Sequence, residues 1–345
     1  MILTILAAVF VFGLLVLVHE FGHFITAKLT GMRVDEFAIG FGPKIFSTKY
    51  GETKYSLRAI PLGGFNDIAG MDPSDNSAGE RGFCEKPVLS RMIVILAGST
   101  MNFILPVILF FGIYATVGVA KPATDPVIGS VIQDMPADDA GLHVGDRILT
   151  LNGETVTTWD EFVTKLRASE ADVPVEISYE RDSQTATVSV TPKFDEKSQR
   201  VLVGIQSSTV YESQDLISAF SLAVENTKNI VVYMLDALAG IFMAPSKAEL
   251  AGPIGIAQMA GQVAETGFVP LLNFAALLSL NLGIINLLPV PALDGGHFVS
   301  LVIEAVRGKP MSAKALMYTQ RVGIALLLAL TLYATTSDLI RVFTK

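Results

Sequence analysis

The sequence has 345 residues, of which 51% are hydrophobic, and its mean hydropathy is +0.51. These values exclude an ordinary soluble protein, and the apolar residues concentrate near 1–27, 92–120, 270–290 and 322–341, which predicts four membrane spans around one soluble insertion. The net charge of −8 argues against a nucleic-acid partner, which would need a basic stripe. The single cysteine, Cys84, excludes an internal disulfide, and we interpret it as incidental rather than catalytic.

The first apolar segment, residues 1–27, contains the motif His19-Glu20-Phe21-Gly22-His23. It lacks the basic start and the small-residue cleavage site of a signal peptide, so we expect a retained span. On a helix, His19 and His23 lie one turn apart and can hold one metal ion, with Glu20 beside them as general base. An ionisable cluster inside a span is costly unless it is functional, so the motif favours a zinc peptidase that works in lipid.

Residues 34–60 alternate with period two on both sides of the turn signal Gly51-Glu52, which predicts a β-hairpin. The run Gly63-Gly64-Phe65 is expected to end this pattern, and the polar residues 66–90 to form a loop. The hairpin can dip toward the metal site and guide a substrate, because irregular backbone is tolerated at membrane depth where it lines a cavity. The alternative is a plain cytoplasmic cap.

Charge bias predicts the orientation of the chain in the membrane. Residues 28–91 carry nine Lys and Arg, whereas residues 121–271 carry ten together with 21 acidic residues. The positive-inside tendency therefore places the loops 28–91 and 298–321 in the cytoplasm and the insertion outside. His19 and His23 then lie toward the cytoplasmic end of the first span.

The second span, 92–120, holds Asn102, which we interpret as a helix–helix hydrogen bond. Strand, turn and helix signals across 125–208 predict a compact α+β domain with His143 on its surface. In the linker region 209–269, the segment 216–245 is apolar at helical spacing but carries three charges. We expect an amphipathic helix at the outer surface there rather than a fifth span. Residues 252–256 are expected to form a break before the third span.

The third span, 270–297, ends in the run Asn286-Leu287-Leu288-Pro289-Val290-Pro291-Ala292-Leu293-Asp294-Gly295-Gly296-His297, whose prolines must break the helix. Asp294 is an expensive anion at this depth unless it is paired or binds metal. Catalytic zinc usually takes three protein ligands, and Asp294 completes that number with His19 and His23. His297 is a rival third ligand that spacing does not exclude, and capping of a following helix is an alternative role for Asp294.

The strings HEFGH, GFGP, PLGGF, PADDAGLHVGDRILTLNGETV, GPIGI and NLLPVPALDGGH together resemble the site-2 protease family, peptidase family M50. The resemblance spans essentially the whole chain and is strongest to RseP-type bacterial regulated intramembrane zinc proteases. It implies a mainly α-helical polytopic membrane protein with four transmembrane helices, a cytoplasmic-side β-hairpin and an inserted α+β PDZ domain. Some members hold two PDZ domains in tandem, where this chain has one, and residues 65–68 do not match the family's loop.

By this resemblance, His19, His23 and Asp294 hold Zn²⁺ and Glu20 is the catalytic base. The residues implied to bind substrate are Asn286, Gly40, Gly42, Gly63 and Gly64. The implied reaction is hydrolysis within the transmembrane segment of single-span substrates, such as anti-sigma-factor-like regulators or signal-peptide remnants, after a prior outer cleavage. The implied location is the bacterial inner membrane, with the active site near the cytoplasmic side.

The PDZ domain is expected either to bind an extended peptide between the strand 127–132 and the helix 159–168, or only to block access. Two rival functions are a PDZ-containing membrane scaffold with a non-catalytic metal site and a metal transporter. A structural zinc site normally has four protein ligands, and the sequence offers three convincing ones. Transporters tend to show internal repeats, and we find none in the sequence.

Overall fold

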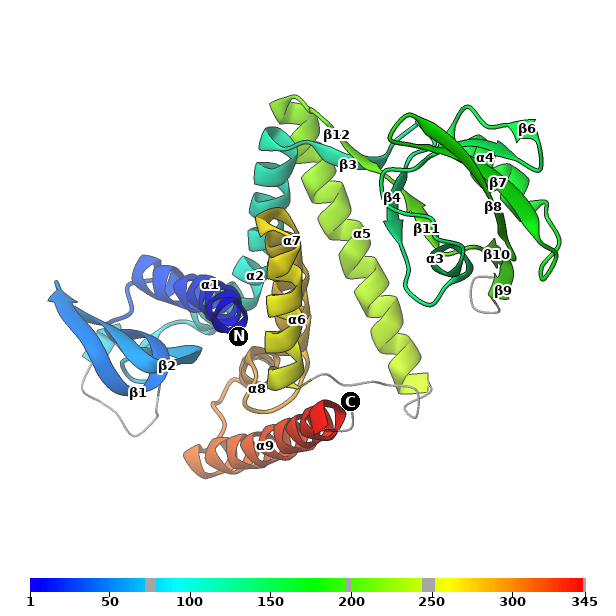
Figure 1. Ribbon diagram of the computed structural model, residues 1–345. Helices are drawn as coiled ribbons and strands as arrows, with labels where there is room; N and C mark the ends of the chain where they lie inside the picture. Colours follow the sequence, from blue (N-terminus) through cyan, green and yellow to red (C-terminus); the bar gives the residue numbers. More distant parts are fainter. Residues whose placement is uncertain (72–78, 196–199, 244–251, 344–345) are drawn as a thin grey trace. The chain divides into compact units, whose positions relative to one another are not determined.

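The computed structural model describes residues 1–71, 79–195, 200–243 and 252–343. The chain divides into two compact units, Met1–Tyr114 with Leu216–Lys345 (unit 1) and Ala115–Asp215 (unit 2) (Figure 1). The elements centred on unit 1 are α1 (Ile2–Leu29), β1 (Val34–Tyr50), β2 (Thr53–Ile68), the 3-10 turns η1 (Gly79–Arg81) and η2 (Phe83–Glu85), α2 (Val88–Thr116), α5 (Leu216–Met243), α6 (Pro253–Glu265), α7 (Phe268–Leu287), α8 (Asp294–Arg307) and α9 (Ala313–Phe343).

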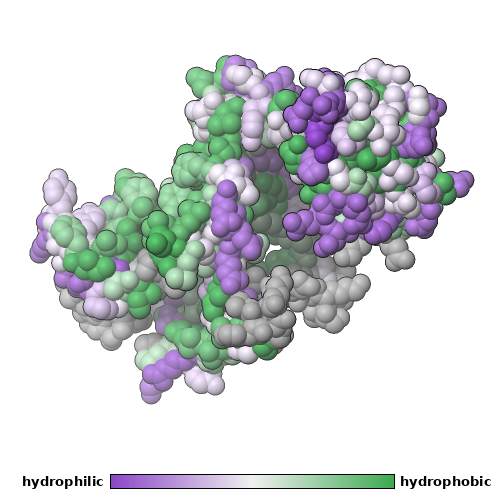
Figure 2. Space-filling model, viewed as in Figure 1, coloured by the Kyte–Doolittle hydropathy of each residue, from purple (hydrophilic) through white to green (hydrophobic). Residues whose placement is uncertain are grey.

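Four of the described helices are long and apolar enough to cross a membrane: α1, α2, α7 and residues 314–340 of α9. Only 17% of the apolar window of α1 is buried inside the protein, so most of its side chains face outward, as a lipid-exposed helix requires. Figure 2 shows this apolar surface over α1, whereas unit 2 carries a largely polar surface. The prediction of a mainly helical membrane protein with four spans is confirmed.

The third predicted span, 270–297, is interrupted. Helix α7 ends at Leu287 and α8 begins at Asp294, because Pro289 and Pro291 cannot continue a helix. Two other boundaries were wrong: the expected break at 252–256 is the start of α6, and the expected loop 298–321 begins inside α8. Segment 216–245 is the single helix α5 as far as Met243, and its last two residues lie outside the described ranges.

The hairpin is larger than the sequence pattern suggests. The prediction that Gly63-Gly64-Phe65 ends it is wrong, because β2 continues to Ile68. Both strands bend, so residues 36–39 of β1 pair with residues 54–57 along one edge and with residues 64–67 along the other. The result is a small sheet in the order 44–50, 53–58, 36–39 and 64–68, with the last segment at an edge. The expected loop 66–90 thus contains the end of β2, the turns η1 and η2 and the start of α2, while residues 72–78 lie outside the described part.

Charged side chains hold the hairpin in place. Glu52, at the tip, accepts hydrogen bonds from Lys28 at the end of α1 (2.5 Å) and twice from Arg81 of η1 (2.7 Å each). The bonds from Arg81 and then Lys28 lower the pKa of the Glu52 carboxyl to about 2. The tip of the hairpin is therefore tied to α1 and to η1 by ion pairs.

Unit 2 is the α+β domain that the sequence predicts. Its elements are β3 (Val119–Pro122), β4 (Ile128–Val131), α3 (Pro136–Asp139), β5 (Arg147–Leu151), β6 (Glu154–Thr155), α4 (Trp159–Arg167), β7 (Val175–Arg181), β8 (Gln184–Val190), β9 (Lys193–Asp195), β10 (Arg200–Leu202), β11 (Ile205–Ser207) and β12 (Thr209–Glu212). A four-stranded sheet in the order β6-β5-β7-β8 packs with α4 around buried Phe162, Ile148 and Ile177. His143 is exposed, as predicted.

Among the described residues, the expected peptide groove between β4 and α4 is not observed. One edge of β4 pairs with β11, and the other meets residues 145–148, where the Ile128 amide donates to the Asp146 carbonyl and Gly145 donates back to Ile128 (2.8 Å each). A strand with both edges occupied cannot accept a further strand. Helix α4 instead contacts β10, which leads into β11.

Candidate active site

The two histidines of the first span and Asp294 of α8 converge on one point. His19 Nε2 lies 3.2 Å from His23 Nε2, and Asp294 Oδ2 lies 3.5 Å and 3.6 Å from these two nitrogens. All three side chains are largely buried, with 12% to 17% of their surface exposed. One helical turn places the histidines on the same face of α1, and the start of α8 brings the carboxylate to them.

This donor set fits a zinc ion. Ligand atoms about 2.0–2.1 Å from a tetrahedral zinc lie about 3.3 Å from one another. The three separations between the nitrogens and Oδ2 of Asp294 fall close to that value. Two imidazoles and one carboxylate are also the ligand types of catalytic zinc sites, which keep a fourth position open.

A tight turn between α7 and α8 delivers Asp294. Ala292 has a left-handed φ of +74°, and a Cβ on Gly295 or Gly296 would overlap the carbonyl oxygens of the preceding turn. The helix cap of α8 is Leu293, and Asp294 is the first residue of the helix, so the capping role considered for Asp294 is not observed. Its Oδ2 instead accepts a hydrogen bond from Ser99 Oγ of α2 (3.0 Å).

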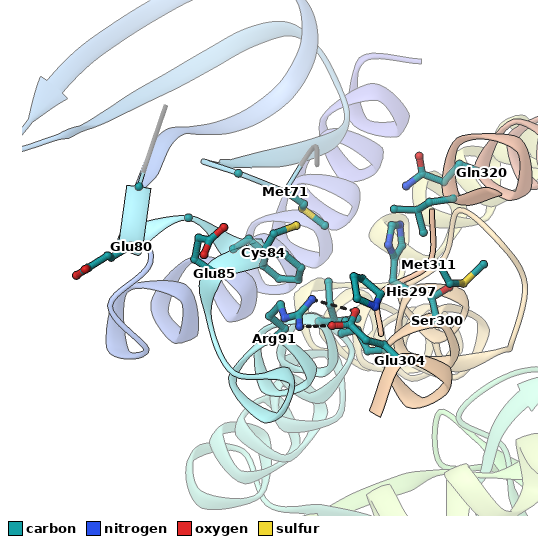
Figure 3. A pocket seen from close by; sticks show the side chains of 18 residues that line it. Met71, Glu80, Cys84, Glu85, Arg91, His297, Ser300, Glu304, Met311 and Gln320 are labelled. Atoms are coloured by element: carbon teal, nitrogen blue, oxygen red, sulfur yellow. Dashed lines mark hydrogen bonds and ion pairs between the residues drawn. The ribbon is translucent and has the colours of Figure 1, made fainter. Parts of the chain in front are cut away.

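The rival ligand His297 lies outside this cluster of ligand atoms. It lines a cavity of about 580 Å³ formed by η1, η2 and parts of α2, α8 and α9 (Figure 3). Across the same cavity, Arg91 donates two hydrogen bonds to the carboxylate of Glu304 (3.1 Å and 2.5 Å). Within the described residues, the cluster of potential ligands contains Asp294 and not His297. The geometry therefore favours Asp294 as the third ligand.

The edge segment of the hairpin reaches Glu20. Asn66 Nδ2 donates to Glu20 Oε2 (2.7 Å) and to the Glu20 carbonyl oxygen (2.8 Å). A Cβ on Gly64 would lie 2.9 Å from Glu20 Cγ and 3.0 Å from Val16 Cγ1, so only glycine permits this approach of β2 to α1. The predicted dip of the hairpin toward the metal site is thus observed.

The other predicted substrate-binding residues make no hydrogen bond to the three clustered ligands among the bonds described for this structure. Gly40 and Gly42 have left-handed φ values of +87° and +82° at the bend of β1, and Gly63 has +113° at the bend of β2. Asn286 is half-buried near the end of α7, before the proline turn. The glycines shape the two bends that turn the edge segment 64–67 toward α1.

Sequence reasoning missed Asn66 and Ser99, which contact Glu20 and Asp294. Asn66 stands 46 residues from Glu20 in a strand, and no spacing rule links a strand to a helix at that distance. Ser99 carried a weak signal, because it is a hydroxyl inside a predominantly apolar span, and the structure buries it. Asn102 was expected in a helix–helix hydrogen bond, and its Nδ2 lies 3.1 Å from His19 Nδ1 of α1.

Glu36 of the hairpin is paired with side chains of the hairpin itself. Glu36 accepts hydrogen bonds from Ser56, from Arg58 (2.9 Å) and from Lys44 (3.2 Å). Burial raises the pKa of the Glu36 carboxyl, but these three bonds together lower it to about 2. The carboxylate therefore remains ionised and bound to its partners over the physiological pH range.

Comparisons with known proteins agree with the geometry. A model of peptidase family M50 matches residues 7–330. The chain is 32% identical to the regulator of sigma-W protease RasP of Bacillus subtilis and 34% identical to the zinc metalloprotease RasP of Bacillus licheniformis, over 99% of both chains in each case. Among solved structures it is similar to the PDZ domain of an SdrC-like protein from Listeria monocytogenes, with 25% identity, 25% of this chain and 90% of that one covered, and a TM-score of 0.22.

The match over nearly the whole length, the relatives and the His-His-Asp cluster lead to the same assignment. The four apolar helices, together with the bacterial relatives, make this a multi-pass bacterial membrane protein. The chain belongs to peptidase family M50 and is a zinc metalloprotease of the site-2 protease type.

Proposed function

We propose that this protease hydrolyses peptide bonds within the transmembrane segments of single-span membrane proteins. The observation that carries the proposal is the position of the catalytic groups: His19, Glu20 and His23 lie in α1, a helix long and apolar enough to cross the bilayer. A peptide bond that reaches these groups must come from a segment at membrane depth. His19, His23 and Asp294 are the proposed zinc ligands, and Glu20 is the proposed base.

Zinc, when bound, polarises a carbonyl and lowers the pKa of bound water to about 7. The Glu20 carboxylate accepts the proton of the attacking water and later donates it to the leaving nitrogen. Asn66, which donates to Oε2 and to the backbone carbonyl of Glu20, orients that carboxylate for both transfers. The Ser99 hydroxyl orients Asp294 in the same way.

A transmembrane helix hides its carbonyls in hydrogen bonds, so the substrate must unwind before attack. The edge segment 64–67 of β2 pairs with residues 36–39 on one side, and no described strand pairs with its other side. An unwound substrate can add there as a further strand, next to Glu20. In this proposal Gly40, Gly42, Gly63 and Gly64 keep the bends that present the edge, and Asn286 binds the substrate backbone.

Charge bias supports a cytoplasmic location for residues 28–91 and an outer location for unit 2. The PDZ domain then admits substrates whose outer part is already trimmed, and membrane-anchored regulators of signalling are the proposed substrate class. If the domain also binds a peptide, we expect the peptide to pair with β11. Among the described strands β11 pairs only with β4, so its other edge is open, and it directly follows β10, the strand that contacts α4.

The test is cleavage of purified single-span reporters in liposomes by wild type, Glu20→Gln and Asp294→Ala, with the cut bond located by mass spectrometry. We expect wild type alone to cut a bond inside the apolar segment. Cuts confined to the soluble flanks would contradict the intramembrane reaction. Zinc binding and PDZ peptide capture without any cleavage would establish the scaffold instead.

A further inference from the structure

Helix α2 supplies none of the three clustered ligands, yet it contacts each of them. The contacts are Val94 O with His23 Nδ1 (2.8 Å), Ser99 Oγ with Asp294 Oδ2 (3.0 Å) and Asn102 Nδ2 with His19 Nδ1 (3.1 Å). The outer hydrogen-bond partners of metal ligands fix their orientation and, for histidine, the nitrogen that carries the proton. Helix α2 is therefore placed to hold the whole ligand set.

The partner of His23 is suited to a metal ligand. Val94 O is a carbonyl oxygen, which only accepts, so the ring proton of His23 lies on Nδ1. Its Nε2 then presents a lone pair toward Asp294 Oδ2 and the common centre. This is the tautomer in which an imidazole binds a metal through Nε2.

The partner of His19 is not arranged in this way. Asn102 is fully buried, its Nδ2 faces His19 Nδ1, and its Oδ1 is a buried atom with no hydrogen-bond partner among the described residues. An amide donor at Nδ1 requires the ring proton on Nε2, the nitrogen that faces the common centre. A buried amide oxygen without a partner also carries an uncompensated desolvation cost.

A half-turn of the Asn102 amide removes both conflicts. It exchanges Oδ1 and Nδ2 without any movement of the backbone, which Ser279 Oγ of α7 holds through the Asn102 carbonyl oxygen (2.9 Å). Oδ1 then accepts the Nδ1 proton of His19, and His19 Nε2 presents its lone pair as His23 does. We propose that Asn102 is a positioning residue that holds His19 as a zinc ligand through its amide oxygen. The inference rests on the proposed ligand role of His19.

The test measures zinc affinity of the full-length protein in detergent by competition with a chromophoric chelator. Asn102→Leu, which has similar bulk and no acceptor, is expected to weaken zinc binding about 10- to 100-fold. Asn102→Asp, which keeps an acceptor oxygen, is expected to remain closer to wild type than Asn102→Leu. Thr100→Val is the matched control, because it removes from α2 an exposed hydroxyl that donates to the Leu96 carbonyl oxygen of the same helix (2.8 Å), and it should leave zinc affinity unchanged.

Zinc affinity of Asn102→Leu equal to wild type, or an equal loss in Asn102→Leu and Asn102→Asp, overturns the proposal. Thermal unfolding followed by circular dichroism checks that each variant is folded, and Asn102→Ala replaces Asn102→Leu if the latter is not. His19→Ala distinguishes failure of the ligand role of His19 from failure of the positioning role of Asn102. If it binds zinc normally, the ligand assignment fails, whereas a loss in His19→Ala without one in Asn102→Leu defeats only the role of Asn102.

Discussion

The two units each contain a buried carboxylate, and the two differ in how their oxygens are used. In unit 2, Asp146 is 1% exposed and both oxygens are taken, Oδ1 by Arg181 Nε (2.6 Å) and Oδ2 by Arg181 Nη2 (2.7 Å) and the His143 amide (2.8 Å). In unit 1, Asp294 Oδ2 has Ser99 as its donor and faces the two histidine nitrogens at 3.5 Å and 3.6 Å.

The polar groups around the two carboxylates differ as well. The amide oxygen of Asn66, beside Glu20, is buried and lacks a hydrogen-bond partner in the described part of the chain. A buried cluster whose groups satisfy one another leaves no acceptor for a ligand, whereas converging ligand atoms beside an unpaired acceptor point to a place for another molecule. The hydrogen bonds therefore distinguish the ion pair of unit 2 from the proposed reaction centre of unit 1.

The largest expected effect is at the third ligand. Asp294→Ala should lose zinc binding and with it all detectable reporter cleavage, because two histidines alone do not complete the usual three-ligand site. His297→Ala, three residues away, is the control and should keep its zinc, as measured by metal analysis after dialysis. Normal zinc in Asp294→Ala with loss in His297→Ala would transfer the ligand role to His297.

The second largest effect is expected at Glu20, where a substitution tests the proposed base without changing zinc binding. Glu20→Gln should lower the cleavage rate about 10²- to 10⁴-fold, the usual contribution of a general base. Zinc content should remain that of wild type, since Glu20 is outside the cluster of ligand atoms. Cleavage at the wild-type rate by a zinc-loaded Glu20→Gln protein would remove Glu20 from the mechanism.

A substitution in the Asp146–Arg181 ion pair should lower the stability of unit 2 and leave zinc binding unchanged. Arg181→Met leaves the Asp146 carboxylate buried without its cation, at a cost of about 2 kcal/mol in the free energy of unfolding of unit 2. Trp159, the single tryptophan of the chain, lies in the core of this unit, so fluorescence reports its unfolding in the full-length protein. An unchanged unfolding midpoint, or a loss of zinc, in Arg181→Met would contradict the distinction between the Asp146 ion pair and the His-His-Asp cluster.

The same pair predicts a pH dependence. Burial raises the pKa of the Asp146 carboxyl, but hydrogen bonds from Arg181 and the His143 amide lower it more, so it lies below its usual value. The stability from this group is therefore present above the unfolded pKa of about 3.9 and is lost as the pH falls through the lower folded value. Unfolding midpoints followed by Trp159 fluorescence should show a smaller loss of stability below about pH 4 in Arg181→Met than in wild type.

A smaller effect is expected at the contact of the hairpin with α1. Gly64→Ala places a methyl group 2.9 Å from Glu20 Cγ and 2.7 Å from the Ala38 carbonyl oxygen, so the edge segment must shift. We expect about a tenfold lower cleavage rate at unchanged zinc content, since misplacement near a catalytic group costs rate. Gly13→Ala in α1 is the control, because its Cβ would meet nothing within 4 Å. Equal cleavage rates in Gly64→Ala and Gly13→Ala would show that the contact between the hairpin and α1 does not affect catalysis.

The smallest effect is expected at Cys84, which is exposed on η2 at the rim of the cavity lined by His297. Cys84→Ser should keep cleavage within about twofold of wild type, in line with the usual effect of exposed substitutions. Treatment of the wild type with a thiol-blocking reagent should likewise leave the rate unchanged. A large loss in both experiments would give this cysteine a role in the reaction.

Local sequence patterns were enough to predict the membrane spans, the histidine pair, the break after α7 and the hairpin. Uniform apolarity specifies the four spans, because a helix in lipid needs no other signal, and the i, i+4 spacing of His19 and His23 puts both rings on one face. The prolines after Leu288 end α7, since proline lacks the amide proton that a helix requires. Period-two alternation likewise revealed the hairpin, although not its second bend, which depends on strand pairing between distant residues.

Only the tertiary structure favours Asp294 over His297 as the proposed third ligand, since three residues of spacing on one helix leave either side chain able to face a distant helix. It also brought Asn66 to Glu20 and Asn102 to His19, contacts made by segments 46 and 83 residues apart. Sequence periodicity specifies which face of an element is apolar, but not which element covers that face. The ligand pair was therefore readable from the sequence, whereas its completion and its hydrogen-bonded surroundings depend on packing between α1, α2, α8 and β2.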